Sequence, residues 1–584
     1  MRKLLLLGDE AIAQGAIDAG LSGMYAYPGT PSTEIMEFIQ ASAEASSRGI
    51  HRQWSANEKT ALETALGMSY TGKRAMVAMK HVGLNVAADP FINSAVTGIN
   101  GGVIVVSADD PSMHSSQNEQ DSRFYGKFAF VPVFEPSSQQ EAYDMVFDAF
   151  DLSEKYRLPV LFRITTRLAH SRAAVTRKAP EMQKKFRLPS DPRQFVLLPA
   201  IARRKYSALL KAYESLKYEN RLAKHNLFTD GRNRKIGVIA CGIAYNYLME
   251  NFPGNGPDFP VLKLSAYPFP ADIINDLTGR CEEVLVLEEG YPLLEEDLRG
   301  ILNNSLKVLG RLDGAIPRVG ELNPMIVAKA LGMKTESVSR VPEVVRTRPP
   351  SFCKGCGHSD TFNAVIEALE EHKGIGVFSD IGCYTLAALP PYSIINSCVD
   401  MGASVTMAVG AADGGLHPSV AVIGDSTFTH SGMTGLLDAV IKKSHVTIII
   451  SDNSTTGMTG GQESHATGRL ESICEGLGVT SPGSLIKHLQ ALERKGHLSH
   501  SPGKNRAWKL TRRRAPVSIP LIGQIAAGTP ILAAENREDD LPVDPRLFGS
   551  HEAFALKVRG DSMIEAQIRD GDMAIIRPQL QAEN

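Results

Sequence analysis

Two groups of polar residues follow apolar runs and carry the residue types of a phosphate and metal site. One group is Gly424, Asp425 and Ser426, and the other contains Asn453 and Thr455. A carboxylate, an amide oxygen and a backbone carbonyl near Thr455 are hard oxygen donors, which Mg²⁺ prefers while keeping positions for phosphate and water. A Gly-Asp-Ser sequence alone is also common in ordinary turns. The presence of the second group favours a diphosphate held through a divalent ion.

A βαβ unit would bring these two groups together. Residues 420–423 and 446–450 are apolar runs typical of buried strands, and residues 434–443 have helical spacing between them. In an open parallel sheet, ligands bind at the carboxyl ends of the strands. We therefore expect both groups at one edge of a parallel sheet.

The N-terminal part shows the same alternation of strands and helices. Apolar runs at 75–79, 103–107 and 160–164 alternate with helical segments, which predicts an α/β fold with a doubly wound parallel sheet. Glu58 stands near the start of a predicted helix, where the helix dipole favours even a solvated carboxylate. Its position alone therefore assigns it no function.

The whole chain is predicted to be multidomain, because 584 residues exceed the usual size of one domain. The predicted segments are an α/β domain at 1–180, a linker with an exposed helix at 181–234, a second α/β domain at 235–340, a third at 350–479, and two smaller parts at 480–515 and 516–584.

Composition excludes several classes of protein. Apolar residues make up 43% and charged residues 22%, and the formal net charge of −2 predicts no bulk attraction to nucleic acid. No apolar run reaches the roughly 20 residues of a membrane-spanning helix. Seven cysteines in so long a chain argue against a disulfide scaffold. These features predict a cytoplasmic protein that does not cross a membrane.

Several long motifs resemble one family of enzymes. They are YPGTPSTEI, SANEKTALETALG, MKHVGLNVAADP, DDPSMHSSQNEQDSRFY, CKGCGH, DIGCYTLAALPP, GDSTFTHSGM and DNSTTGMTGGQ. In this order they resemble the alpha subunit of the indolepyruvate ferredoxin oxidoreductases over residues 1 to about 479. The resemblance implies a thiamine diphosphate enzyme that oxidatively decarboxylates aryl 2-oxoacids.

The resemblance also implies roles for individual residues. Glu58 would hydrogen-bond the aminopyrimidine ring of thiamine diphosphate and favour the tautomer that deprotonates the thiazolium carbon. Thr30 and Arg123 would hold the substrate carboxylate. The remaining cofactor residues would be Gly402, Gly424 and Ser426, with Asp425, Asn453 and the backbone of Thr455 as Mg²⁺ ligands.

The family passes electrons singly through iron-sulfur clusters to ferredoxin, while coenzyme A takes the acyl group. By resemblance, Cys353, Cys356 and Cys383 are three ligands of a proximal four-iron cluster. A zinc site that includes His358, or free thiols, are the alternatives. A beta subunit of the same oxidoreductase would be a partner.

After residue 479 the chain resembles the LexA repressors instead. Residues 480–515 are rich in Lys and Arg and resemble part of a winged helix, although a solvated basic face is the alternative. Residues 516–584 resemble a truncated, mostly-β self-cleaving peptidase, with Ala527-Gly528 as the scissile bond and Ser562 as the nucleophile. A serine nucleophile needs a general base, and we expect none in the residues after Ser562.

The sequence therefore predicts an oxidoreductase subunit that binds thiamine diphosphate and Mg²⁺. Cys474 is the last cysteine in the chain, so the ligand set for iron-sulfur clusters is incomplete and we expect impaired electron transfer. The alternative function is a DNA-binding transcriptional repressor fragment of the LexA type.

Overall fold

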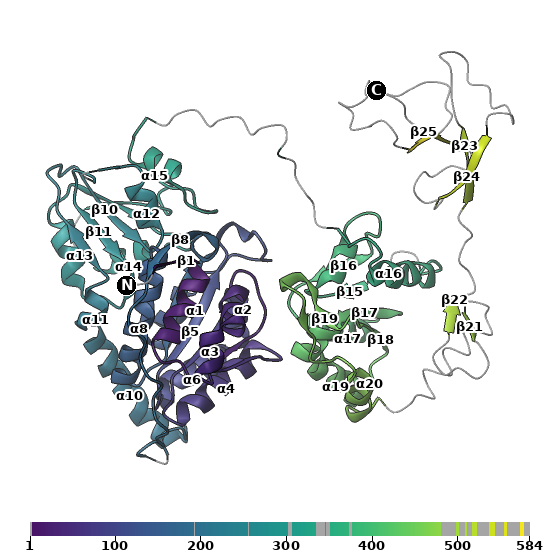
Figure 1. Cartoon of the computed structure of the whole chain (residues 1–584), viewed down its shortest axis with the longest axis horizontal. Coiled ribbons are helices and arrows are strands. Elements are labelled where there is room, and N and C mark those ends of the chain that lie inside the picture. The colour runs from purple at the N-terminus through teal and green to yellow at the C-terminus, as the bar shows by residue number, and fades with distance from the viewer. Residues whose placement is uncertain are drawn as a thin grey trace. The chain divides into compact units, whose positions relative to one another are not determined.

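A computed structural model of the full chain shows the fold (Figure 1). The structure describes residues 3–191, 193–254, 256–301, 306–334, 345, 351–372 and 377–479, together with six short strands after residue 479. Residues Met1–Gly478 form one compact unit and Val479–Asn584 form a second. Each unit is considered by itself.

The first sheet of the N-terminal unit has seven strands in the order β12-β6-β7-β5-β4-β2-β3. All pairings are parallel except that between β12 and β6. The strands are β2 (Gly23–Ala26), β3 (His51–Trp54), β4 (Ala75–Lys80), β5 (Val103–Asp109), β6 (Val133–Phe134), β7 (Val160–Thr165) and β12 (Ala266–Tyr267). Strands β4, β5 and β7 are buried at every residue, which agrees with their mostly apolar sequences, although they also contain the charged residues Lys80, Asp109 and Arg163.

Helices connect and cover these strands. They are α1 (Gly8–Asp18), α2 (Thr33–Ala41), α3 (Ala43–Ser47), α4 (Glu58–Tyr70), α5 (His81–Val86), α6 (Ala88–Thr97), α7 (Arg123–Ala129), α8 (Gln139–Tyr156) and α9 (Thr166–His170). The short strands β1 (Lys3–Leu7) and β8 (Arg172–Thr176) form a separate antiparallel pair.

The segment after β8 lies along this same domain. The amide of Glu181 donates to the carbonyl of Asp18, and the amide of Arg187 donates to the carbonyl of Thr71 at 2.9 Å. Helix α10 (Pro199–Leu216) then packs against α6, with Leu209 and Leu216 buried and most of its other residues at least partly exposed.

The second sheet has five strands in the order β14-β13-β10-β11-β9. Its strands are β9 (Leu227–Thr229), β10 (Ile236–Cys241), β11 (Val261–Leu264), β13 (Glu283–Leu287) and β14 (Lys307–Leu309). Its helices are α11 (Asn220–Ala223), α12 (Ala244–Met249), α13 (Ala271–Thr278), α14 (Leu293–Ile301) and α15 (Pro324–Ala330). Because β12 follows β11 in the chain and pairs with β6, this domain contributes a strand to the first sheet.

The third sheet has four parallel strands in the order β16-β15-β17-β18. They are β15 (Val377–Ser379), β16 (Ile395–Cys398), β17 (Ser419–Gly424) and β18 (Val446–Ser451). The helices are α16 (Gly357–Ala368), α17 (Ala403–Asp413), α18 (Asp425–Thr427), α19 (Met433–Lys442) and α20 (Leu470–Gly476), and a short hairpin pairs β19 (Thr455–Thr456) with β20 (Gln462–Glu463). The α/β fold with parallel sheets predicted from the sequence is confirmed.

The second unit is described only in its strands. β21 (Leu498–His500) pairs with β22 (Trp508–Leu510), and a second sheet has the order β24-β23-β25-β26. Its strands are β23 (Val517–Ile522), β24 (Arg537–Val543), β25 (Phe554–Lys557) and β26 (Met573–Ile576). The predicted peptidase residues Ala527, Gly528 and Ser562 lie outside the described residues.

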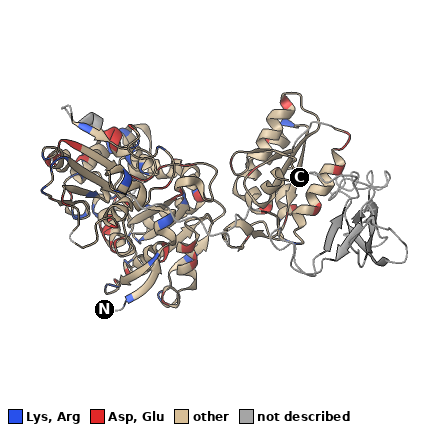
Figure 2. Ribbon diagram, turned by 90° about the horizontal axis from the view of Figure 1, so that it is seen from above, with Lys and Arg blue, Asp and Glu red and all other residues tan. Residues whose placement is uncertain are grey.

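Two further observations concern the distribution of charge and the hydrophobicity of the helices. Lys and Arg lie among Asp and Glu over the described part of the N-terminal unit (Figure 2). None of the helices in the described ranges is both long and apolar enough to cross a membrane.

Candidate active site

A cavity of about 500 Å³ lies between the first and third sheets of the N-terminal unit. Residues at the carboxyl ends of strands from both sheets line it. Tyr27 and Lys80 come from the ends of β2 and β4, and Asp425 and Asn453 follow β17 and β18. This is the edge at which parallel sheets bind ligands.

The polar residues predicted to hold a diphosphate and a cation all line this cavity: Gly424, Asp425, Ser426, Asn453 and Thr455. The Asp425 side chain is buried, and its Oδ2 has no hydrogen-bond partner among the described residues. Burial raises the pKa of Asp425. An unsatisfied buried carboxylate oxygen is costly, and a divalent cation would compensate it. The oxygen donors at this end of the cavity therefore fit Mg²⁺.

Gly402, the other predicted cofactor residue, does not line the cavity, although Asp400 and Met401 do. Its φ of +94° lies in the left-handed region, and a Cβ there would stand 2.7 Å from that of Ser431. Its amide donates to the buried Asp380 carboxylate at 3.1 Å. Burial raises the pKa of Asp380 to about 6. Gly402 therefore shapes the loop that carries the lining residues.

Glu58 forms the opposite wall of the cavity, where it opens α4. Its buried carboxylate lies against His430, with 2.7 Å between Glu58 Oε2 and His430 Nε2. Asn57, which caps α4, also donates from Nδ2 to the carbonyl of His430 at 2.9 Å. His430 stands in a π-helical turn, Phe428–Gly432, a local widening of the helix that is frequent at functional sites.

Tyr27 makes a second bridge between the two walls. Its ring meets the His430 ring edge-on with centroids 4.7 Å apart. The Tyr27 hydroxyl lies 3.3 Å from Ser426 Oγ, which is 2.8 Å from Thr456 Oγ1. Burial raises the pKa of Tyr27, so its hydroxyl stays protonated. Glu58 and Ser426, which were predicted separately in the two domains, are thus connected through Tyr27 and His430.

Curated relatives share most of this chain. The indolepyruvate oxidoreductase subunit IorA of Archaeoglobus fulgidus is 40% identical over 525 residues, covering 84% of each chain. The subunit of the same name from Methanothermobacter thermautotrophicus is 41% identical over 480 residues, covering 79% of this chain and 76% of its own. The chain belongs to the IorA family.

Family models agree with this assignment. A pyruvate flavodoxin/ferredoxin oxidoreductase thiamine diphosphate-binding domain matches residues 14–220, and the C-terminal thiamine pyrophosphate-binding domain of thiamine enzymes matches residues 380–507. Together with the IorA relatives, they show a thiamine diphosphate-dependent 2-oxoacid oxidoreductase. A solved structure of 2-oxoglutarate:ferredoxin oxidoreductase from Magnetococcus marinus matches with a TM-score of 0.46 and 17% identity, over 56% of this chain and 65% of its own.

The C-terminal residues match different proteins. A peptidase S24-like model covers residues 520–584. The LexA repressor of Carboxydothermus hydrogenoformans is 46% identical over 118 residues, which is 20% of this chain and 58% of the repressor. The predicted change from IorA-like to LexA-like sequence is confirmed.

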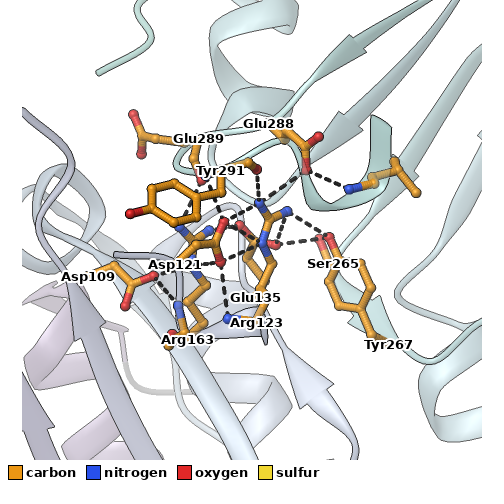
Figure 3. Close-up of polar contacts among 12 residues, drawn as sticks. Asp109, Asp121, Arg123, Glu135, Arg163, Ser265, Tyr267, Glu288, Glu289 and Tyr291 are labelled. Carbon is orange, nitrogen blue, oxygen red and sulfur yellow. Dashed lines mark hydrogen bonds and ion pairs between the residues drawn. The ribbon is translucent and has the colours of Figure 1, made fainter. Parts of the chain in front are cut away.

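Arg123, expected from the IorA resemblance to hold the substrate carboxylate, is not among the residues that line the cavity. Figure 3 shows its side chain among the acidic residues Asp121, Glu135 and Glu288. Its buried guanidinium pairs with Asp121 and, at 3.1 Å, with Glu288, and it donates to the carbonyl of Tyr291 at 3.0 Å. These acids come from both the first and the second domain, and Arg163 pairs with others in the same cluster. The geometry gives Arg123 a structural role between domains and does not support substrate binding.

Of the three cysteines predicted as cluster ligands, one lines the cavity and the other two lie near it in the fold. Cys383 lines it, and burial together with the nearby Cys356 and Cys353 raises the pKa of the Cys383 thiol. Cys356 Sγ lies 3.2 Å from Nδ1 of His358, which also lines the cavity.

Sequence reasoning missed His430 and Lys80 as residues of the site. His430 stands within the quoted GDSTFTHSGM motif, but only the folded chain shows that it reaches Glu58. Lys80 was detectable as a charged residue that ends a fully apolar strand.

Proposed function

We propose that this chain carries the thiamine diphosphate site of an indolepyruvate oxidoreductase and decarboxylates aryl 2-oxoacids oxidatively. Coenzyme A is the proposed acyl acceptor and ferredoxin the electron acceptor, with a beta subunit as partner in the cytoplasm. The observation that carries the proposal is one cavity in which Glu58 of the first domain contacts His430 of the third, and in which one oxygen of Asp425 has no hydrogen-bond partner among the described residues.

Each wall has a distinct task in this proposal. Asp425, Asn453 and the backbone carbonyl of Thr455 would hold Mg²⁺ and, through it, the diphosphate. Glu58 would accept a hydrogen bond from the aminopyrimidine ring and favour the tautomer that deprotonates the thiazolium carbon. His430 orients the Glu58 carboxylate through Oε2 and leaves Oε1 on the side of Gly83, another cavity residue. Thiamine diphosphate, when bound, supplies the acidic carbon and the electron sink for decarboxylation.

Isothermal titration of the full chain with thiamine diphosphate and Mg²⁺ tests the proposal. Asp425→Ala should abolish Mg²⁺-dependent binding because it removes a charged ligand. Asp438→Ala is the matched control, since Asp438 is exposed on α19 and pairs with Lys442. Binding by the parent chain and the control, but not by Asp425→Ala, supports the assignment. No binding by the parent chain, or equal binding by all three, contradicts it.

The cysteine cluster is proposed to hold iron and sulfide for electron transfer. The proximity of Cys353, Cys356 and Cys383 supports this, since thiolates are the usual ligands of such clusters. Iron, sulfide and zinc analysis of anaerobically purified chain tests the ligand type. Zinc without sulfide would instead support a site that includes His358.

The LexA-like part carries a second candidate function, DNA contact by residues 480–515. Its identity to LexA repressors and its basic composition favour it. A gel-shift titration of the full chain at low and physiological salt tests this. Replacing the three basic residues at 512–514 should weaken any shift, and an unchanged shift would contradict the assignment.

A further inference from the structure

Lys80 is a buried cation at the edge of the active-site cavity. It is the last residue of β4, only 9% exposed, and lines the cavity. Gly29, which also lines the cavity, makes room for it, because a Cβ at Gly29 would stand 3.2 Å from that of Lys80. Lysine is almost never buried without a partner. A group that balances the charge of the Lys80 ammonium is therefore expected beside it.

The described residues supply hydrogen-bond acceptors for Lys80 but no directly paired carboxylate. Lys80 Nζ donates to the carbonyl of Ser115 at 2.7 Å and lies 3.3 Å from Ser115 Oγ. Among the described residues, no carboxylate oxygen lies within ion-pair distance of Nζ. Asp110 is the acid whose charge acts on Lys80, but Asp110 already accepts hydrogen bonds from Ser116 and Thr166. Burial lowers the pKa of Lys80 to about 8.

The groups around Lys80 form a polar corner of the cavity. The Ser115 hydroxyl also lies 3.3 Å from the carbonyl of Thr30, the residue expected to contact substrate. Gln117 and Asn118 line the cavity from the same segment as Ser115. An ammonium group has three donors, and the contacts to Ser115 leave capacity for an acceptor in the cavity.

This corner is positioned beside the Glu58 wall. Helix α5 begins directly after Lys80 and carries Gly83, where a Cβ would stand 2.5 Å from Glu58 Oε1. One helical turn therefore separates the buried cation from the carboxylate proposed to contact the cofactor. Val82, Val86 and Met401 also line the cavity and supply apolar surface.

We propose that Lys80, supported by Ser115 and Thr30, binds the carboxylate of the 2-oxoacid substrate. The inference rests on the proposed function and gives Lys80 the task that Arg123 cannot perform from its buried ion-pair cluster. A carboxylate beside Nζ would provide the missing countercharge, and a charge-assisted bond in a buried site is strong. The apolar lining would accept the aryl group.

Binding of 3-phenylpropionate tests this inference, because the compound keeps an aryl group and a carboxylate but lacks the keto group that reacts. The full chain, saturated with thiamine diphosphate and Mg²⁺, is titrated beside Lys80→Met, Lys80→Arg and the exposed control Lys59→Met. Lys80→Met should weaken 3-phenylpropionate roughly 10- to 100-fold, as expected for one charge-assisted hydrogen bond. Lys80→Arg should restore part of the affinity.

The neutral 3-phenylpropanamide separates the charge interaction from packing. Its affinity should be the same for the parent chain and Lys80→Met, and an equal loss for amide and acid would contradict the inference. Unchanged affinity of Lys80→Met for the acid would also overturn it. Thiamine diphosphate binding, measured first, tests the proposed function separately.

The pH dependence of the parent chain gives a second test that needs no variant to fold. The ammonium form binds the acid, so affinity for 3-phenylpropionate should fall above about pH 8, where free Lys80 loses its proton. In Lys80→Arg the affinity should stay constant over this range, because arginine remains charged. A flat profile in the parent chain would contradict the inference.

Discussion

Gly83→Ala tests whether the Glu58 carboxylate must stand where the structure places it. Gly83 lies inside α5 and is buried against Glu58. A Cβ added there would meet Glu58 Oε1 at 2.5 Å, Cγ at 2.6 Å and Cδ at 2.8 Å. Ordinary contact begins at 3.4 Å, so the carboxylate would have to move by nearly an ångström. The 2.7 Å contact to His430 would be strained or lost.

Three contributions set the expected magnitude. Alanine in place of a helical glycine stabilises by up to about 1 kcal/mol. Overpacking costs about 1–3 kcal/mol, and disturbing a hydrogen bond to a charged group costs about 1.5–3 kcal/mol. We therefore expect Gly83→Ala to lower the free energy of unfolding by about 1.5–6 kcal/mol. The displaced carboxylate should also weaken thiamine diphosphate binding at least about tenfold.

Gly67→Ala is the matched control. Gly67 lies in α4, the helix that Glu58 opens, and an added Cβ would have no atom within 4 Å. This variant should be as stable as the parent chain or up to about 1 kcal/mol more stable, with unchanged cofactor affinity. Thermal unfolding measures the stability of each variant, and isothermal titration measures its affinity for thiamine diphosphate. Parent-like thiamine diphosphate binding by Gly83→Ala would refute the proposed task of Glu58.

Two further predictions concern buried charges outside the cavity. Both carboxylate oxygens of Asp9 are buried without a hydrogen-bond partner among the described residues, and burial raises its pKa well above the usual value. The folded protein favours the protonated form of Asp9, so its stability should fall as pH rises above about 4. The variant Asp9→Asn should be about 1–3 kcal/mol more stable than the parent chain at neutral pH. Equal melting curves of the two proteins from pH 4 to 8 would contradict this prediction. Arg123→Met should lower the free energy of unfolding by about 3–5 kcal/mol, because it leaves Asp121 buried without its main cation. The control Arg232→Met removes an exposed ion pair and should change the free energy of unfolding by less than about 1 kcal/mol. Similar shifts in melting temperature for the two variants would contradict the structural role of Arg123.

The parallel sheets could be predicted because their central strands are rich in apolar residues. Strands such as β4 and β5 are buried on both faces, and their sequences are apolar except near their carboxyl ends. The pairing of β12 with β6 could not be predicted in the same way. That pair contains two residues from each strand and joins different domains, which leaves no periodic pattern to detect.

The site was predictable where its residues directly follow strands. Asp425, Asn453 and Thr455 line one cavity, as expected from their positions after strands. Glu58, which only the family resemblance singled out, lines the same cavity, and the roles of all four residues stay predictions. The contact of His430 with Glu58 was not predictable, because it depends on a π-helical turn and on the approach of two domains.

The choice between Arg123 and Lys80 shows what a buried charge can indicate. Arg123 is surrounded by Asp121, Glu135 and Glu288, so its countercharge is complete within the protein. Lys80 has a carbonyl and a hydroxyl as its hydrogen-bond partners, and it faces the cavity. Taking an ion out of water is compensated only when a partner is present. Lys80, which has no carboxylate at ion-pair distance among the described residues, is therefore the better candidate for a ligand site, even though arginine is the more usual carboxylate-binding residue.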